Sequence, residues 1–70
     1  NWIMAKIQLN GKKITIKSNF SVYDLLKKYN LNNKKIALEY NGKILSGINY
    51  KKKYLKNNDK LEIVHFIGGG

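Results

Sequence analysis

The sequence contains no cysteine, no proline and a single histidine, His65. Without cysteine, disulfides, thiolate zinc sites and cysteine nucleophiles are excluded, which favours a reducing compartment. The four carboxylate side chains are scattered along the chain: Asp24, Glu39, Asp59 and Glu62. A metal site needs several ligands at suitable spacing, and this sequence has none. We therefore expect no metal, no cofactor bound by this chain and no enzyme activity of its own.

Long apolar runs are also missing. No run approaches the roughly 20 residues that a membrane-spanning helix needs, and polar residues interrupt the N-terminal segment too early for a signal peptide. Residues 1–3 precede Met4, a candidate start of the native chain. We expect no membrane partner and a location in the cytoplasm, or in the plastid stroma if the source is an alga.

Arginine is absent as well, although the formal net charge is +10. The lysines are spread in short groups, such as Lys12 and Lys13, or Lys51 to Lys53. Lysine contacts to phosphate could make such a chain a nucleic-acid binder. However, the planar guanidinium group of arginine is the one suited to bidentate recognition of phosphate, and its absence argues against this function. A solvated basic surface that meets an acidic protein partner is the favoured interpretation, and a nucleic-acid function the alternative.

Regular patterns are present in the N-terminal part. Apolar residues alternate with polar ones over residues 3–9 and again over residues 13–17, which is the period of a half-buried strand. Asn10 and Gly11 lie between them, and this pair is the strongest short signal for a type I′ hairpin turn. The first part of the chain is therefore predicted to be a β-hairpin.

A helix is predicted over residues 22–29. Ser21 is a good N-cap, Asp24 three residues later makes the start close to a capping box, and Asn30 can end the helix in a left-handed turn. The apolar residues fall at helical spacing: Val22, Leu25, Leu26 and Tyr29. This stripe should face the core.

The second half predicts further strands over residues 36–40, 43–45 and 61–67, with a hairpin-type turn at Asn41 and Gly42. Ile48, Tyr54 and Leu55 are expected to anchor a turn or short 3₁₀ segment. The last strand can pair centrally, parallel to the first. We therefore predict an α+β fold, the β-grasp or ubiquitin-like arrangement, with a mixed sheet of four to five strands on one main helix. Residues 1–67 form the domain and residues 68–70 a glycine tail.

The three terminal glycines are the remaining chemical feature. They follow an apolar strand directly, so a frayed end is the alternative to a functional tail. Glycine has no Cβ, and such a tail can thread a narrow channel in a partner enzyme. The carboxylate of Gly70 is sterically open to reaction with ATP and then with a sulfur nucleophile. Since the chain has no cysteine, covalently carried sulfur would sit on that carboxylate.

The predicted element order, together with the ending DKLEIVHFIGGG over residues 59–70, resembles the sulfur carrier family of thiamine biosynthesis, ThiS, across nearly the whole chain. The resemblance implies that an E1-like adenylating enzyme uses ATP and magnesium to form an acyl-adenylate on Gly70. Sulfur from a cysteine desulfurase route then leaves a thiocarboxylate, which thiazole synthase accepts. Gly68 and Gly69 would form the slender segment that enters the channel of the partner enzyme. Val64 and Phe66 would form an apolar docking surface or, equally, part of the core.

Two other functions stay open. A Gly-Gly end is shared by related ubiquitin-like carriers and modifiers, which donate sulfur to molybdopterin or tRNA or are conjugated to lysines. A basic β-grasp module for RNA is the other alternative. The strongly basic charge departs from what the resemblance implies and leaves the electrostatics of the partner surface open.

Overall fold

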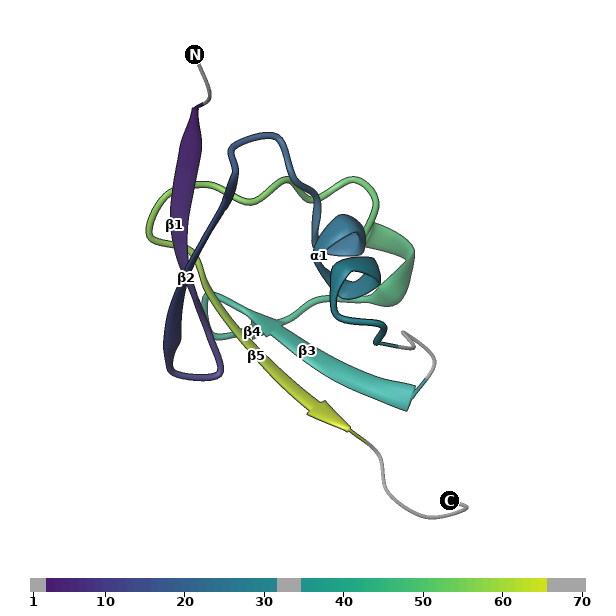
Figure 1. The fold of residues 1–70 in the computed structure, drawn as a ribbon. Coiled ribbons are helices and arrows are strands. Elements are labelled where there is room, and N and C mark those ends of the chain that lie inside the picture. Colours follow the sequence, from purple (N-terminus) through teal and green to yellow (C-terminus); the bar gives the residue numbers. More distant parts are fainter. Residues whose placement is uncertain (1–2, 32–34, 66–70) are drawn as a thin grey trace.

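The computed structural model describes residues 3–31 and 35–65. The elements follow the predicted order, and their bounds are β1 Met4–Leu9, β2 Lys12–Lys17, α1 Val22–Lys28, β3 Ile36–Tyr40, β4 Lys43–Ile44, the 3₁₀ helix η2 Gly47–Asn49 and β5 Lys60–His65. In Figure 1 the strands form one twisted sheet, and α1 lies beside it. No helix within the described ranges is long and apolar enough to cross a membrane.

The sheet has the strand order β2-β1-β5-β3-β4, so the last strand lies in the middle. β5 runs parallel to β1 and antiparallel to β3. The predicted mixed β-grasp sheet, with one main helix and the last strand parallel to the first, is confirmed. The division between residues 1–67 and the tail lies outside the described residues and stays a prediction.

Both hairpin turns have the backbone that their sequences predict. Asn10 and Gly11 have φ values of 49° and 82°, and Asn41 and Gly42 have 51° and 88°. Two consecutive residues with positive φ define the type I′ turn, which matches the right-handed twist of the flanking strands. These turns fix the registers of β1 with β2 and of β3 with β4.

The start of α1 is a full capping box. The Ser21 hydroxyl accepts a hydrogen bond from the Asp24 N–H, and an Asp24 carboxylate oxygen accepts one from the Ser21 N–H, both at 3.0 Å. Two N–H groups that would otherwise lack partners are satisfied in this way. The helix ends at Lys28, one residue before the predicted end, and Asn30 takes the expected left-handed conformation with φ 56°.

The core combines the inner face of the sheet with one side of α1. Its buried apolar residues are Ala5, Ile7, Ile16, Val22, Leu25, Leu26, Ile36, Leu38, Tyr50, Leu55, Leu61 and Ile63. Tyr29, which was predicted to face the core, is 43% exposed, because α1 ends before it. Of the residues expected to anchor the turn or 3₁₀ segment, Leu55 is buried, whereas Ile48 and Tyr54 are exposed. The connection after η2 instead lies against the start of α1, where the Tyr50 carbonyl accepts from the Tyr23 N–H. This bond holds the segment that carries Tyr50, whose side chain is part of the buried core.

Candidate functional site at the end of the central strand

β5 is the strand that leads to the C-terminal residues, and it ends at His65, five residues before Gly70. It pairs with β3 along five positions, from Tyr40 opposite Leu61 to Ile36 opposite His65. Its parallel pairing with β1 covers only Lys60 and Leu61. Of the predicted site residues, Val64 is described by the structure, whereas Phe66, Gly68, Gly69 and Gly70 lie outside the described residues. What the structure describes is the strand that carries them.

Beyond Leu61, a side chain continues the pairing that β1 began. Asn10 Oδ1 accepts a hydrogen bond from the Ile63 N–H at 2.7 Å, and Asn10 Nδ2 donates to the Ile63 carbonyl at 3.3 Å. β1 has turned away at this point, so its backbone no longer reaches β5. The amide of Asn10 therefore satisfies both backbone groups of Ile63 and holds the second half of β5 in the sheet.

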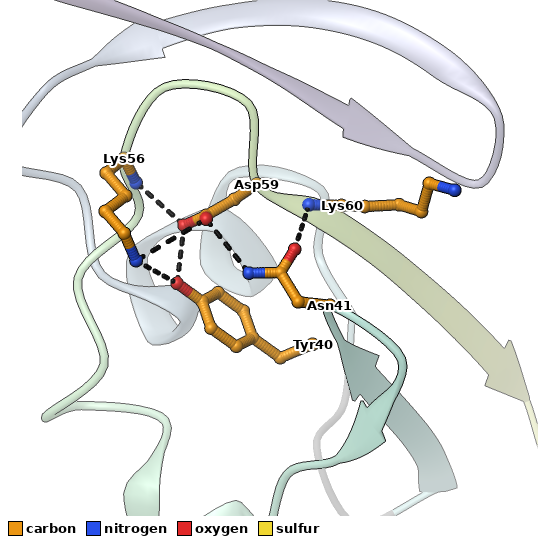
Figure 2. A network of polar contacts seen from close by, with 5 residues as sticks. All are labelled: Tyr40, Asn41, Lys56, Asp59 and Lys60. Carbon is orange, nitrogen blue, oxygen red and sulfur yellow. Dashed lines mark hydrogen bonds and ion pairs between the residues drawn. The ribbon is translucent and has the colours of Figure 1, made fainter.

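The start of β5 is held by a polar network around Asp59 (Figure 2). The side chain of Asp59 is only 3% exposed. Its Oδ2 accepts from the Tyr40 hydroxyl at 2.6 Å and from the Lys56 N–H at 2.9 Å, and its Oδ1 accepts from Asn41 Nδ2 at 3.1 Å. Asn41 Oδ1 in turn accepts from the Lys60 N–H at 2.7 Å. The network joins the β3–β4 turn to the first residue of β5.

This network shifts three pKa values. Burial alone would raise the pKa of Asp59, but the hydrogen bonds from Tyr40, the Lys56 backbone and Asn41, with the Lys56 charge, outweigh burial and hold this pKa below its ordinary value of 3.8. Burial and the bond to Asp59 raise the pKa of Tyr40. The hydrogen bond to Tyr40 and the Asp59 charge raise the pKa of Lys56. Asp59 is therefore a buried, ionised carboxylate that serves the fold, a role that its place among the scattered carboxylates of the sequence did not indicate.

Val64 lies on the outer face of the sheet, opposite Ala37 on β3, and its side chain is 61% exposed. Leu61 and Ile63 alternate with it and are buried in the core. Val64 is therefore not part of the core, and its role in an apolar docking surface stays a prediction. Figure 1 shows β5 between β1 and β3. Val64 directly precedes His65, the last residue of β5, so its exposed side chain lies close to the end of this strand.

Potential ligating groups do not gather around this strand. No group of three histidine or carboxylate side chains that could hold a metal ion occurs in residues 3–31 and 35–65. His65, which the alternation placed with Leu61 and Ile63, is exposed at the end of β5. Glu62 lies opposite Glu39 on the outer face. Within the described residues, the site therefore consists of β5, which is paired on both sides, and of the exposed outer face that carries Val64. The C-terminal residues follow β5 in the sequence.

Known proteins are similar to this chain in sequence, and a solved structure is similar to it in fold. The model of the ThiS family matches residues 5–70. The sulfur carrier protein ThiS of Bacillus subtilis is 42% identical over 65 residues, which are 91% of this chain and 98% of that protein. A thiazole synthase of Paramagnetospirillum magneticum is 35% identical over 65 residues, which are 93% of this chain but 20% of that protein.

A solved structure agrees with these relatives. The crystal structure of the thiamine biosynthesis protein ThiS from Geobacter metallireducens superimposes with a TM-score of 0.80 at 26% identity, covering 93% of this chain and 99% of that one. The agreement therefore extends over nearly all of both chains, and the family match reaches Gly70. The chain belongs to the ThiS family.

Proposed function

We propose that this chain is a sulfur carrier of thiamine biosynthesis, which bears sulfur as a thiocarboxylate on Gly70 and donates it for thiazole formation. The observation that carries this proposal is the family match through residue 70, at the end of a chain that has no cysteine to hold sulfur instead. The B. subtilis relative, named a sulfur carrier protein, supports the same function.

The proposed chemistry takes place in two steps on one carboxylate. A Gly70 oxygen attacks the α-phosphorus of ATP, and pyrophosphate leaves, which gives an acyl-adenylate. A sulfur nucleophile supplied through a cysteine desulfurase then attacks the carbonyl carbon. The carbon–oxygen bond to AMP breaks, and a carbon–sulfur bond replaces it. Where the nucleophile is a persulfide, a thiol then cleaves its sulfur–sulfur bond and is itself oxidised to a disulfide, which releases the thiocarboxylate. Glycine presents no Cβ beside this carbon, so both attacks are unhindered.

In this scheme the chain is a co-substrate and not an enzyme. ATP and magnesium belong to the adenylating enzyme, which is the first partner. Gly68 and Gly69 serve as the thread into that enzyme, and Phe66 and the exposed Val64 are the apolar docking residues. The match to part of a protein named thiazole synthase supports a thiazole synthase as the second partner. We propose the cytoplasm, or the plastid stroma in an alga, as the compartment, since a chain without cysteine suits a reducing environment.

Intact-protein mass spectrometry tests the proposal after incubation with ATP, a sulfur donor and the adenylating enzyme. We expect a mass gain that equals the replacement of one oxygen by sulfur, and fragmentation should map it to Gly70. Adding thiazole synthase and following thiazole formation separates this pathway from molybdopterin or tRNA thiolation. An unchanged mass, with an enzyme that is active on another ThiS protein, would overturn the proposal.

The matched control is a variant that lacks residues 68–70 and so has no terminal glycine. This variant should show no mass gain and yet unfold at the same temperature as the wild type, because the described core is complete without the last three residues. A lost thermal transition would contradict the separation of tail and domain, and a retained mass gain would place the chemistry elsewhere.

A further inference from the structure

Two adjoining hollows lie on the surface beside the β3–β4 turn. The larger has a volume of about 450 Å³ and is lined by Tyr40, Asn41, Lys43, Ile44, Leu45 and Lys53. The smaller, of about 290 Å³, is lined by Leu45, Asn49, Lys52 and Lys53. They share Leu45 and Lys53 and so form one continuous depression, which we call the lysine groove.

The groove carries positive charge that nothing in the described ranges neutralises. Its lining includes Lys43, Lys52 and Lys53 but no carboxylate. Asp59 is linked to the groove through Tyr40, but its side chain is buried and already accepts from Tyr40, Asn41 and the Lys56 backbone. The one ion pair within the described residues is that of Asp59 with Lys56. Within the described residues no carboxylate lines the groove, which leaves it open to an anion from another molecule.

The groove is also apolar, which decides what kind of anion suits it. Ile44 stands 75% exposed in its lining, and Leu45 is half-buried beside it. Covering exposed aliphatic surface is favourable for an apolar side chain, but a phosphodiester backbone offers none.

The aromatic ring in the groove further disfavours a nucleic acid. Single-stranded nucleic acids are bound largely by stacking bases on open aromatic faces. Here Lys53 Nζ lies 4.8 Å and Lys56 Nζ 5.6 Å from the centroid of the Tyr40 ring. These ammonium groups occupy positions from which a base would otherwise stack. The lining therefore fits acidic side chains interspersed with apolar ones.

We propose that the lysine groove binds an acidic, partly apolar segment of a partner protein. Its position separates this contact from the tail, because Tyr40 pairs opposite Leu61 whereas His65 pairs with Ile36 at the other end of β3. Four residues of strand correspond to about 13 Å. A bound segment can thus anchor the partner while the end of β5 stays free. The contact does not depend on the chemistry at Gly70, so it can be tested without sulfur transfer.

The test measures binding of a short fluorescent peptide that alternates glutamate and leucine, by fluorescence anisotropy at physiological ionic strength. The variant Lys43→Gln/Lys52→Gln removes two exposed lysines whose side chains make no hydrogen bond, ion pair or ring contact within the described residues, so folding should be unaffected. We expect its affinity for the peptide to fall by about 3- to 30-fold, since each exposed ion pair contributes modestly. Amide shifts in NMR should concentrate at residues 40–45 and 49–53.

The matched control, Lys12→Gln/Lys13→Gln, removes the same charge from the β1–β2 hairpin and should change the affinity less than about twofold. A peptide that alternates glutamine and leucine should bind far more weakly. Equal losses in both double variants, or shifts spread over all lysines, would show attraction to net charge alone and overturn the proposal. Tighter binding of a single-stranded RNA, weakened by Lys43→Gln/Lys52→Gln, would overturn it in favour of a nucleic acid.

Discussion

The side chain of Asn10 forms with the Ile63 backbone the two hydrogen bonds that a neighbouring strand residue would form. Asn10 is also the first residue of the type I′ turn, with φ 49°. The same residue thus sends β1 away from β5 and replaces the backbone contacts that are lost when it does so. Because β5 leads to the C-terminal glycines, this contact helps to hold the strand from which the tail extends.

Replacing Asn10 with glycine separates its two roles. Glycine adopts positive φ without strain, so the turn should persist while the Ile63 N–H and carbonyl lose their partners. Unpaired backbone groups in a part-buried position cost about 1–3 kcal/mol. We expect the free energy of unfolding, measured by urea denaturation, to fall by about this amount.

The control for this variant is Asn30→Gly at the end of α1. Asn30 has a similar left-handed backbone, with φ 56°, but its side chain makes no hydrogen bond within the described residues. Its replacement should change stability by less than about 0.5 kcal/mol. Equal effects of the two substitutions would show that Asn10 contributes through its backbone conformation alone.

Tyr40→Phe tests the network at the start of β5. The substitution leaves the ring in place but removes the hydroxyl that donates to Asp59 at 2.6 Å and accepts from Lys56 at 3.1 Å. Hydrogen bonds to charged groups contribute about 1.5–3 kcal/mol, so urea denaturation at pH 7 should show a loss of this size. Tyr54→Phe, at an exposed tyrosine without such a bond, should be nearly neutral. A neutral Tyr40→Phe would mean that water or Lys56 replaces the hydroxyl.

Acid should weaken the fold through Asp59. Its pKa is lower in the folded chain than its ordinary value of 3.8, so its contribution to stability is fully present above that value. The contribution is lost as the pH falls through the lower folded pKa. The stability difference between wild type and Asp59→Asn should therefore be largest near neutral pH and shrink below pH 3.8. Parallel stability profiles of the two proteins down to pH 2 would contradict this assignment.

Local signals were enough to predict much of the fold. The turns at Asn10 and Asn41 and the cap at Ser21 are determined by a few adjacent residues, and each is confirmed. The order of these elements restricts the sheet to few arrangements, which is why the central position of β5 could be predicted too. For the site, the terminal glycines were found from composition and resemblance, not from geometry.

The contacts that were missed join residues far apart in the sequence. Asn10 and Ile63 are 53 positions apart, and no pattern near Asn10 indicates that its amide will meet β5. Tyr50 is buried because its segment packs on α1, whereas Ile48 two positions earlier is exposed. The face of Val64 could not be decided either, because β5 has apolar residues at both alternations. Only the pairing with β3 shows that Leu61 and Ile63 face the core.

Leu26→Ala tests the apolar face of α1, where Val22, Leu25 and Leu26 are buried as predicted. Leu26 is 2% exposed within the core, and shortening a buried leucine to alanine typically costs about 2–5 kcal/mol, including the cavity it leaves. Ile48→Ala is the matched truncation at a side chain that is 82% exposed, and it should cost less than about 0.5 kcal/mol. Thermal and urea unfolding of both variants would check the pair. Similar losses would show that the two side chains are buried to a similar extent.

Val64→Thr tests whether the outer face of β5 contacts the proposed adenylating enzyme. Threonine keeps the β-branched shape that suits a strand, and Val64 is mostly exposed, so stability should stay within about 0.5 kcal/mol of the wild type. If the enzyme covers this side chain, burying an unpaired hydroxyl costs about 1–3 kcal/mol. The KM for the carrier in an ATP–pyrophosphate exchange assay should then rise about fivefold or more. Ile48→Thr, on the connection after β4, should leave KM unchanged. A normal KM for Val64→Thr would move the docking surface away from this face, while Gly70 would still be adenylated.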